Sequence, residues 1–452
     1  MTAVAGTAFD RIPLRICIGW GIGTMAVATL FNAVNVLLLR YLVDHVGMGA
    51  ALAGLLIGFS KLYDAVIDPV VGSASDRTKS RAGRRRPYLL AGGVLLALAS
   101  IALFNVPGGL GATALPVYVA FALILYASGY AVFSVPYMAM PAEMTGDTQE
   151  RARLISWRVY AVAVASLIST FVGPIVIARA GGGQAGYTAM SMMIAVVVLL
   201  ATLYCFRFTR DARFVAVPAP SRTGFWSKLT SLGGNRPFLV LMLAKLLQLT
   251  ALAVTQAATP FLFKRVLQLS DAMLGVYFAL FYLAIIVCQP LWLWLAPRFG
   301  KRNLFIASTG LYGLFYISWW FVTPQEPLMF VFGRAIVLGA LGGAGLLLGQ
   351  SLLPDTMEWD HKLTGLHREG VLSGLYTMIE KFAFAMGTAV TGVVLGTAGY
   401  IQGFGTAVHQ PPSAIAAIYV LGSFLPTCLL LASCVALLFY DLTEAKLKSA
   451  TG

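Results

Sequence analysis

Residues 61–87, KLYDAVIDPVVGSASDRTKSRAGRRRP, begin in an apolar run and end in a dense basic loop. Lys61, Asp64 and Asp68 are spaced i, i+3 and i+7, so a helix would carry all three charges on one face. The apolar residues around them are typical of a membrane span, where each charge costs about 2.5–3.5 kcal/mol on insertion scales. This cost predicts a polar functional site inside a membrane helix, with Lys61 partly neutralising the two carboxylates.

The composition predicts an all-α integral membrane protein. Of its 452 residues, 59% are hydrophobic and only 11% are charged, whereas a soluble domain carries about 25% charged residues. Apolar runs long enough to span a membrane recur along the chain, which predicts about twelve transmembrane helices. The first run continues as a full-length span, so we expect no cleavable signal peptide.

Basic residues gather in alternate loops. They crowd the loops after the second, fourth, sixth and eighth predicted spans, whereas residues 105–116, 323–327 and 399–412 contain no lysine or arginine. By the positive-inside rule, the basic loops and both termini are predicted to lie in the cytoplasm. The same rule explains the net charge of +14 without a nucleic-acid partner.

The longest charged connection, residues 207–236, falls near the middle of the chain. We predict that it is a cytoplasmic linker between an N-terminal six-helix bundle, residues 1–206, and a C-terminal six-helix bundle, residues 237–452. The substrate path would then lie between the bundles at mid-membrane. The five cysteines form no CxxC pair, and no catalytic or phosphate-binding motif is present, so neither a metal site nor an enzyme is predicted.

Four segments resemble one family of transporters. Residues 72–87, GSASDRTKSRAGRRRP, resemble the loop signature of the major facilitator superfamily, in the longer form of the glycoside–pentoside–hexuronide:cation symporters. Residues 61–72 are similar to that family's span-two motif, D-x-x-x-D-P. Residues 135–158 and 352–387 resemble the segments that join spans four and five and spans ten and eleven. The resemblance covers both halves of the chain and implies the major facilitator fold, with twelve transmembrane helices in two six-helix bundles.

The resemblance also implies a cation site and a substrate site. Asp64 and Asp68 match the family's two cation-binding carboxylates, and Lys61 matches a basic residue one turn before them. Arg158 matches an arginine that contacts sugar, and Lys381 matches a lysine near the site. The other residues expected to bind the substrate are Ser134, Tyr137 and Asn32.

Two departures from the family pattern bear on the coupling ion. Ile67 stands where the sodium users of the family have asparagine, and Ala131 stands where they have threonine. Two side-chain oxygens are therefore missing, whereas a carboxylate pair alone can bind and release a proton. The ion is predicted to be a proton or sodium, with the proton favoured. The sequence leaves open whether Glu380 replaces the missing oxygens, and it predicts that Lys381, rather than its neighbour Glu380, faces the cavity.

Charged residues in the basic loops and at the nearby span ends are expected to form a cytoplasmic gate. In this interpretation they clamp the cytoplasmic face in one state and release it in another. The alternative is a set of solvated loop charges. The residues are Asp76, Arg77, Arg84, Arg85, Glu143, Arg151, Asp355, Arg368 and Glu369.

These features predict a secondary active transporter that couples uptake of a sugar, glycoside or hexuronide to a proton or sodium by alternating access. Its partners would be that solute, the cation and membrane lipid, with no cofactor, in a cell membrane such as a bacterial inner membrane. One alternative is a carrier of a lysolipid-like or other amphipathic solute, because spans one and four lack the acids of the family's galactoside carriers. Another is a non-transporting sensor or scaffold. The cations that would suit an acidic substrate are Lys61, Arg158, Lys245 and Lys381.

Overall fold

In the computed structural model, the described residues include twelve helical stretches that are long and apolar enough to cross a membrane. This confirms the predicted all-α membrane fold. The structure describes residues 11–80, 83–145, 147–212, 235–324, 326–365, 368–403, 409–442 and 446, without the side chains of residues 148, 152 and 369.

The spans follow one another along the chain, and several pass through a short π-helical or 3-10 segment. The helices of the first half are α1 (Leu14–Ala33, continued by Val34–Leu38), α2 (Ala50–Arg77), α3 (Arg86–Phe104), α4 (Ala114–Met144), α5 (Thr148–Leu167, continued by Ile168–Val172), α6 (Gly173–Arg179) and α7 (Gly183–Phe208). Those of the second half are α9 (Arg236–Phe261, continued by Leu262–Val266), α10 (Asp271–Phe299), α11 (Lys301–Tyr316, continued by Ile317–Phe321), α12 (Leu328–Thr364), α13 (Glu369–Thr397), α14 (Pro412–Tyr419, continued by Val420–Phe424) and α15 (Leu425–Leu438).

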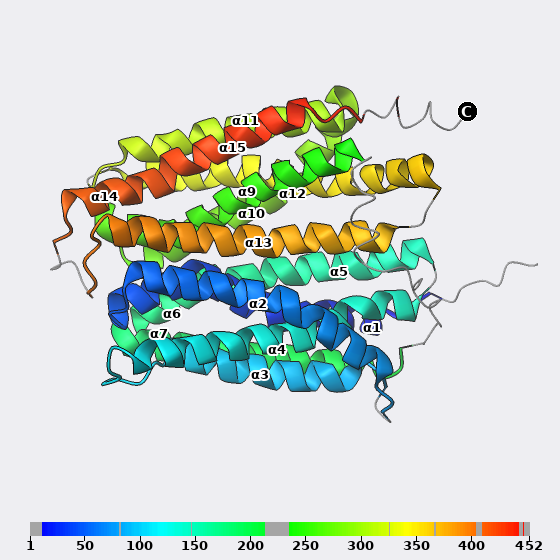
Figure 1. The fold of residues 1–452 in the computed structure, drawn as a ribbon, viewed down its shortest axis with the longest axis horizontal. Coiled ribbons are helices and arrows are strands. Elements are labelled where there is room, and N and C mark those ends of the chain that lie inside the picture. Colours follow the sequence, from blue (N-terminus) through cyan, green and yellow to red (C-terminus); the bar gives the residue numbers. More distant parts are fainter. Residues whose placement is uncertain are drawn as a thin grey trace, which may run out of the picture.

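The helices form two bundles that lie side by side (Figure 1). Helices α1–α7 make up the N-terminal bundle and α9–α15 the C-terminal bundle. Residues 213–234, most of the predicted linker, lie outside the described residues, so its bounds remain a prediction.

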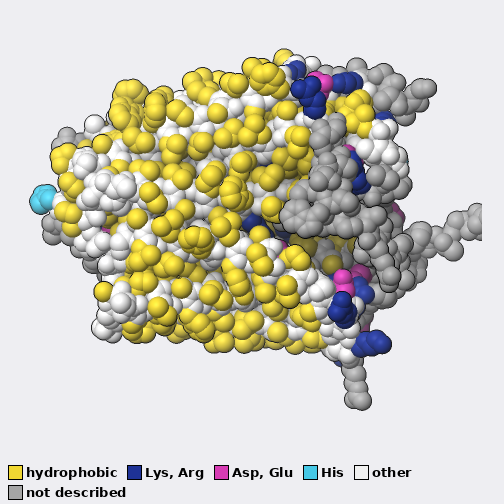
Figure 2. All heavy atoms as spheres, in the orientation of Figure 1, with side chains coloured by type: hydrophobic (Ala, Val, Ile, Leu, Met, Phe, Trp, Pro, Cys, Tyr) yellow, Lys and Arg dark blue, Asp and Glu magenta, His cyan; other side chains and the backbone are white. Residues whose placement is uncertain are grey.

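The flanks of the molecule are apolar, and charged side chains gather at one end (Figure 2). Large apolar side chains such as Val66, Phe121 and Val287 are exposed on the flanks. An exposed apolar surface of this extent is stable against lipid and costly in water. One end carries the loops that follow Arg77 and Phe299, and we call it the basic end. The opposite end carries the loop from α1 to α2 and the loop from α13 to α14, and we call it the far end.

The two bundles approach each other closely in the halves of their helices nearer the far end. There α2 packs against α13, and small residues permit the contact. A Cβ atom added to Gly392 would lie 2.4 Å from the carbonyl oxygen of Ala50, and one added to Gly54 would lie 2.7 Å from Cα of Gly392. Any side chain at these glycines would therefore push the bundles apart.

Candidate functional site

A cavity of about 490 Å³ lies between the bundles, near the middle of the helices that line it. Ligand pockets in proteins measure about 300–1,000 Å³, so the cavity has room for a sugar-sized molecule. Both bundles contribute to its lining, which agrees with the predicted place of the substrate path. The predicted residues that line it are Asn32, Lys61, Asp64, Arg158 and Lys381.

Lys381 bridges the two carboxylates of α2. Its Nζ lies 2.8 Å from Oδ2 of Asp64 and also forms an ion pair with Asp68. Because Lys381 belongs to α13, this bridge joins the two bundles. The Oδ1 atoms of Asp64 and Asp68 are buried and have no hydrogen-bond donor among the described residues. Two carboxylates facing one ammonium group leave one negative charge uncompensated, and a bound cation would neutralise it.

That Lys61 partly neutralises these carboxylates stays a prediction, because no direct ion pair joins them among the described residues. Within the described part of the chain Lys61 forms no ion pair, and its Nζ donates to the hydroxyl of Tyr126 at 3.4 Å. The Nζ also lies 4.4 Å from the centre of the Phe31 ring. Lys61 is thus directed toward α1 and α4, whereas Lys381 enters from the opposite bundle and reaches both acids.

A second ion pair lines the other side of α13. Nζ of Lys245 on α9 lies 2.8 Å from Oε1 of Glu380 and also donates to the hydroxyl of Tyr376. The expectation that only one of Glu380 and Lys381 faces the cavity is therefore wrong, since both line it. Helix α13 lies between α2 and α9. The rotation of about 100° between neighbouring helical residues directs Lys381 toward α2 and Glu380 toward α9.

Arg158 lines the cavity from α5 without a carboxylate partner among the described residues. Its Nε is buried and has no hydrogen-bond acceptor there. Asn32 lines the cavity nearby, and its Nδ2 donates to Oγ of Ser166 at 3.0 Å. The N-terminal bundle therefore presents both a guanidinium group and neutral polar groups to the cavity.

Tyr137 was predicted to bind the substrate, and this prediction is wrong. Its side chain is 1% exposed, stacks on Trp20 with 4.8 Å between ring centres, and donates its hydroxyl to the carbonyl oxygen of Trp20 at 2.7 Å. Ser134 is also not part of the cavity lining. Helix α4 reaches the cavity at Tyr126 and Tyr130, and Ser134 lies one turn beyond that lining, toward the basic end.

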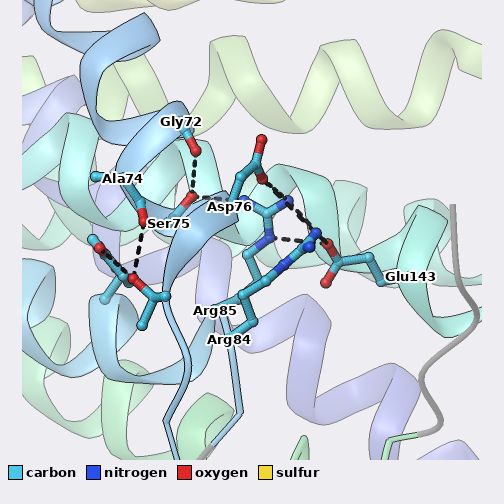
Figure 3. Close-up of polar contacts among 9 residues, drawn as sticks. Gly72, Ala74, Ser75, Asp76, Arg84, Arg85 and Glu143 are labelled. Carbon is cyan, nitrogen blue, oxygen red and sulfur yellow. Dashed lines mark hydrogen bonds and ion pairs between the residues drawn. The ribbon is translucent and has the colours of Figure 1, made fainter. Parts of the chain in front are cut away.

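The predicted gate residues gather in two clusters at the basic end. In the N-terminal bundle, Arg85 contacts Glu143 Oε1 with Nε at 3.0 Å and Nη2 at 2.9 Å (Figure 3). Nη2 of Arg85 also lies 2.6 Å from Asp76, and Nη2 of Arg84 lies 2.5 Å from Glu143.

The C-terminal bundle has its own cluster, in which Arg368 lies 2.7 Å from Asp360 and Lys301 lies 3.0 Å from Asp355. Each of these ion pairs at the basic end joins described residues of one bundle only, so a gate between the bundles remains a prediction. The remaining predicted residues are Arg77, which is exposed, Arg151, which donates to the carbonyl oxygen of Thr145, and Glu369, whose side chain lies outside the described residues.

A charge network that the sequence analysis missed joins the two bundles at the far end. Arg40 pairs with Asp271 of the opposite bundle, and Nη2 of Arg265 lies 3.0 Å from Asp44. The hydroxyl of Tyr400 also donates to Asp44, at 2.8 Å. Arg40 and Asp44 are only 2% and 4% exposed, so this far-end network is buried.

The sequence does contain a signal for the far-end network. Arg40 and Asp44 are spaced i, i+4 directly after the first span, and Arg265 stands at the end of the seventh span. Arginines on this side depart from the positive-inside pattern. Their burial in ion pairs explains the departure, because they hold the far end of the bundles together.

The chain matches the family model described as MFS/sugar transport protein over residues 19–444. The chain belongs to this family. The match confirms the family membership that the four sequence segments indicated. It also shows that the protein is a transporter and not an enzyme.

Relatives and solved structures agree with this assignment. The chain is 26% identical over 445 residues to the glucuronide carrier protein homolog of Escherichia coli (strain K12), covering 97% of this chain and 95% of that protein. It is 25% identical over 439 residues to an inner membrane symporter of the same organism, with 96% and 93% covered. The crystal structure of a D-xylose-proton symporter superposes on this chain with a TM-score of 0.67 at 14% sequence identity. The superposition covers 95% of this chain and 98% of the symporter chain, so the two share a fold.

Proposed function

We propose that the protein is a symporter that couples uptake of a sugar, glycoside or hexuronide to a proton or sodium by alternating access. It acts in the cell membrane, with the basic end and both termini in the cytoplasm. Membership of a sugar transport family supports this function, as do relatives named as a symporter and a glucuronide carrier protein homolog. In the structure, described ion pairs close the far end and none joins the bundles at the basic end, as in a carrier open to the cytoplasm.

The bridge from Lys381 to Asp64 and Asp68 is the observation that carries the proposal. A cation that binds the carboxylates competes with Lys381 for the same oxygen atoms. Its binding therefore weakens a contact between the bundles, which links occupancy of the site to their relative movement. The proton is favoured because Ile67 and Ala131 provide no side-chain oxygen to complete a sodium shell.

The remaining lining of the cavity suits a carbohydrate. The rings of Phe31, Tyr130 and Phe384 line the cavity, and aromatic side chains can pack against the apolar face of a sugar ring. Neutral polar side chains, Asn32 and Gln256 among them, line the same cavity and can exchange hydrogen bonds with hydroxyl groups.

Uptake into proteoliposomes tests the proposal. A panel of glycosides and hexuronides is offered under an imposed pH gradient and, separately, under a sodium gradient. We expect uptake driven by the pH gradient in the wild type, and loss of gradient-driven uptake when Asp64→Asn and Asp68→Asn are combined. The matched control is Glu358→Gln, which removes an acid that pairs with Lys362 outside the cavity.

Each alternative function predicts a different result. Uptake that persists in the double variant would refute the coupling role of the two carboxylates. Stimulation by sodium alone would mean that other oxygen atoms complete a sodium site. Competition by lysolipids and not by glycosides would favour the amphipathic carrier, and binding without net flux would favour a sensor.

A further inference from the structure

Helix α13 contributes to the cavity an acid, Glu380, that stands outside the bridge formed by Lys381. Thr377, Glu380 and Phe384 are spaced i, i+3 and i+7, and all three line the cavity, so they share one face of α13. Lys381 reaches the acids of α2, whereas Glu380 pairs with Lys245 of α9. The pair of Glu380 and Lys245 therefore belongs to the C-terminal bundle alone.

Lys245 holds the carboxylate of Glu380 in one orientation. Nζ of Lys245 lies 2.8 Å from Oε1 of Glu380. The same Nζ donates to the hydroxyl of Tyr376 and lies 3.7 Å from the centre of its ring. Tyr376 and Glu380 are spaced i, i+4, so one turn of α13 contacts the ammonium group at two points. The lysine is restricted by these contacts and restricts the carboxylate in turn, so the carboxylate is ordered before a ligand binds.

The carboxylate of Glu380 is also accessible from the cavity. Its side chain is 37% exposed, compared with 8% for Asp64 and 26% for Asp68. Lys245 contacts Oε1, and no residue in the described part of the chain donates to Oε2. A ligand in the cavity can therefore donate a hydrogen bond to Oε2 without displacing Lys245.

The pair offers an acceptor and a donor side by side. An ammonium group has three N–H donors, and among the described residues Glu380 and Tyr376 take two of those of Lys245, which leaves one for a ligand. A hydroxyl group both donates and accepts, and a sugar carries such groups on neighbouring carbon atoms. A ligand carboxylate would instead meet the negative charge of Glu380. This part of the lining therefore suits neutral hydroxyl groups.

We propose that Glu380 is a specificity-determining residue, which accepts a hydrogen bond from one particular hydroxyl group of the transported sugar, with Lys245 as its positioning partner. A hydrogen bond to an ionised acceptor is about twice as strong as one between neutral groups. A sugar without that hydroxyl leaves the carboxylate without its donor and binds less tightly. The inference rests on the proposed transport function and adds a residue of the C-terminal bundle that selects among sugars.

The alternative is that the pair only packs α13 against α9. Lys245→Met combined with Glu380→Met removes both charges together, and replacing a whole buried ion pair by apolar residues is often neutral for stability. If the pair has only a packing role, this double variant should bind sugars as the wild type does. If Glu380 recognises a hydroxyl group, the double variant should lose the discrimination that depends on that group.

The experiment removes hydroxyl groups from the ligand one at a time. The probes are methyl β-D-glucoside, methyl β-D-galactoside and methyl β-D-xyloside and, for the tightest of the three, its 2-, 3- and 4-deoxy analogues. Binding to the purified full-length protein is measured by calorimetry, and uptake is measured in proteoliposomes. In the wild type we expect one of the deoxygenations to weaken binding about 10- to 100-fold through loss of the bond to Glu380.

Variants then assign that hydroxyl group to Glu380. In the double variant the same deoxygenation should no longer weaken binding, whereas the other deoxygenations should cost as much as in the wild type. Glu380→Gln keeps a neutral acceptor, so the cost should fall to about 2- to 10-fold, which gives a second test if the double variant fails to fold. The control Glu326→Gln removes the acid of another ion pair of the same bundle, outside the cavity, and should leave every cost unchanged.

Three results would overturn the inference: wild-type affinities in the double variant, deoxygenation costs that are the same in the wild type and in the Glu380 variants, or no binding of any of the three glycosides. Failure of the proposed function gives a different result, namely discrimination that depends on Glu380 without uptake driven by either gradient. Gradient-driven uptake of a glycoside that is indifferent to both Glu380 variants would overturn the role of Glu380 alone.

Discussion

The far-end network predicts that one buried carboxylate controls which end of the carrier is open. Asp44 is the centre of this network, since it lies 3.0 Å from Arg265, accepts from Tyr400 at 2.8 Å, and lies 3.7 Å from Arg40. Asp44→Asn keeps the shape of the side chain and removes its charge. Arg40 then keeps its ion pair with Asp271, whereas Arg265 loses its ion pair with Asp44.

The size of the shift that Asp44→Asn causes between far-end-closed and far-end-open protein follows from the burial of the charged side chains. Arg40 and Asp44 are 2% and 4% exposed when the far end is closed, and the network becomes hydrated when it opens. Removing one partner of a buried ion pair costs about 3–5 kcal/mol. Asparagine still accepts a hydrogen bond, so we take the lower value. A cost of about 3 kcal/mol shifts the ratio of far-end-closed to far-end-open protein by about 100-fold.

Distances between spin labels can measure this shift. Gly108 and His409 lie in exposed far-end loops of opposite bundles, so cysteines there can carry labels once the five native cysteines are replaced. We expect Asp44→Asn to add a population with a longer distance between the labels. The control is Glu326→Gln, because Glu326 forms a half-buried pair with Arg334, at 2.7 Å, inside one bundle.

Two results would refute this reasoning. If Asp44→Asn leaves the distance distribution unchanged, the ion pairs do not hold the far end closed. If Glu326→Gln lengthens the distance as much, the effect reflects general loss of stability and not release of the two bundles.

Three further predictions follow from single positions. Gly392→Ala is expected to slow uptake, because its Cβ would lie 2.4 Å from a carbonyl oxygen of α2, whereas Gly374→Ala meets nothing and should leave proteoliposome uptake unchanged. Burial, and then the charge of Arg40, lower the pKa of His45, between α1 and α2, from 6.5 to about 4. Between pH 6.5 and 4 the unfolded chain therefore binds a proton that the folded chain does not, so the unfolding temperature should fall over this window in the wild type and less in His45→Gln. Glu143→Gln removes the negative charge that two arginines share and should lower the free energy of unfolding by about 1–3 kcal/mol, measurable by thermal unfolding.

The fold could be predicted because it depends on a property of each segment by itself. A long apolar run must satisfy its backbone hydrogen bonds internally in lipid, which leaves helices as the solution for this chain. The i, i+3, i+7 spacing of Lys61, Asp64 and Asp68 likewise placed three charges on one helix before any tertiary contact was known.

The partners of those charges could not be predicted in the same way. Local spacing favoured Lys61 as the residue that neutralises the acids, but Lys381, more than 300 positions later, forms the bridge. The same limit applies to Tyr137, whose contact with Trp20 depends on how α1 packs against α4. Periodicity shows which residues share a face of one helix, and it does not show which helix that face meets.

The sequence alone therefore determined the membrane environment, the number of spans and the acid pair, since each depends on composition or short-range spacing, and the resemblance of four segments indicated the family. Only the tertiary structure decided that Lys381 joins the bundles, that Lys61 and Arg158 have no carboxylate partner in the described part of the chain, and that the far end is closed through Asp44. The first two of these facts arise where α2, α5, α9 and α13 from two bundles converge on one cavity, and the third arises where the bundles meet at the far end. Charges that are distant along the chain become neighbours in this low-dielectric interior. Their free energy there depends on whether each charge has a partner of opposite sign.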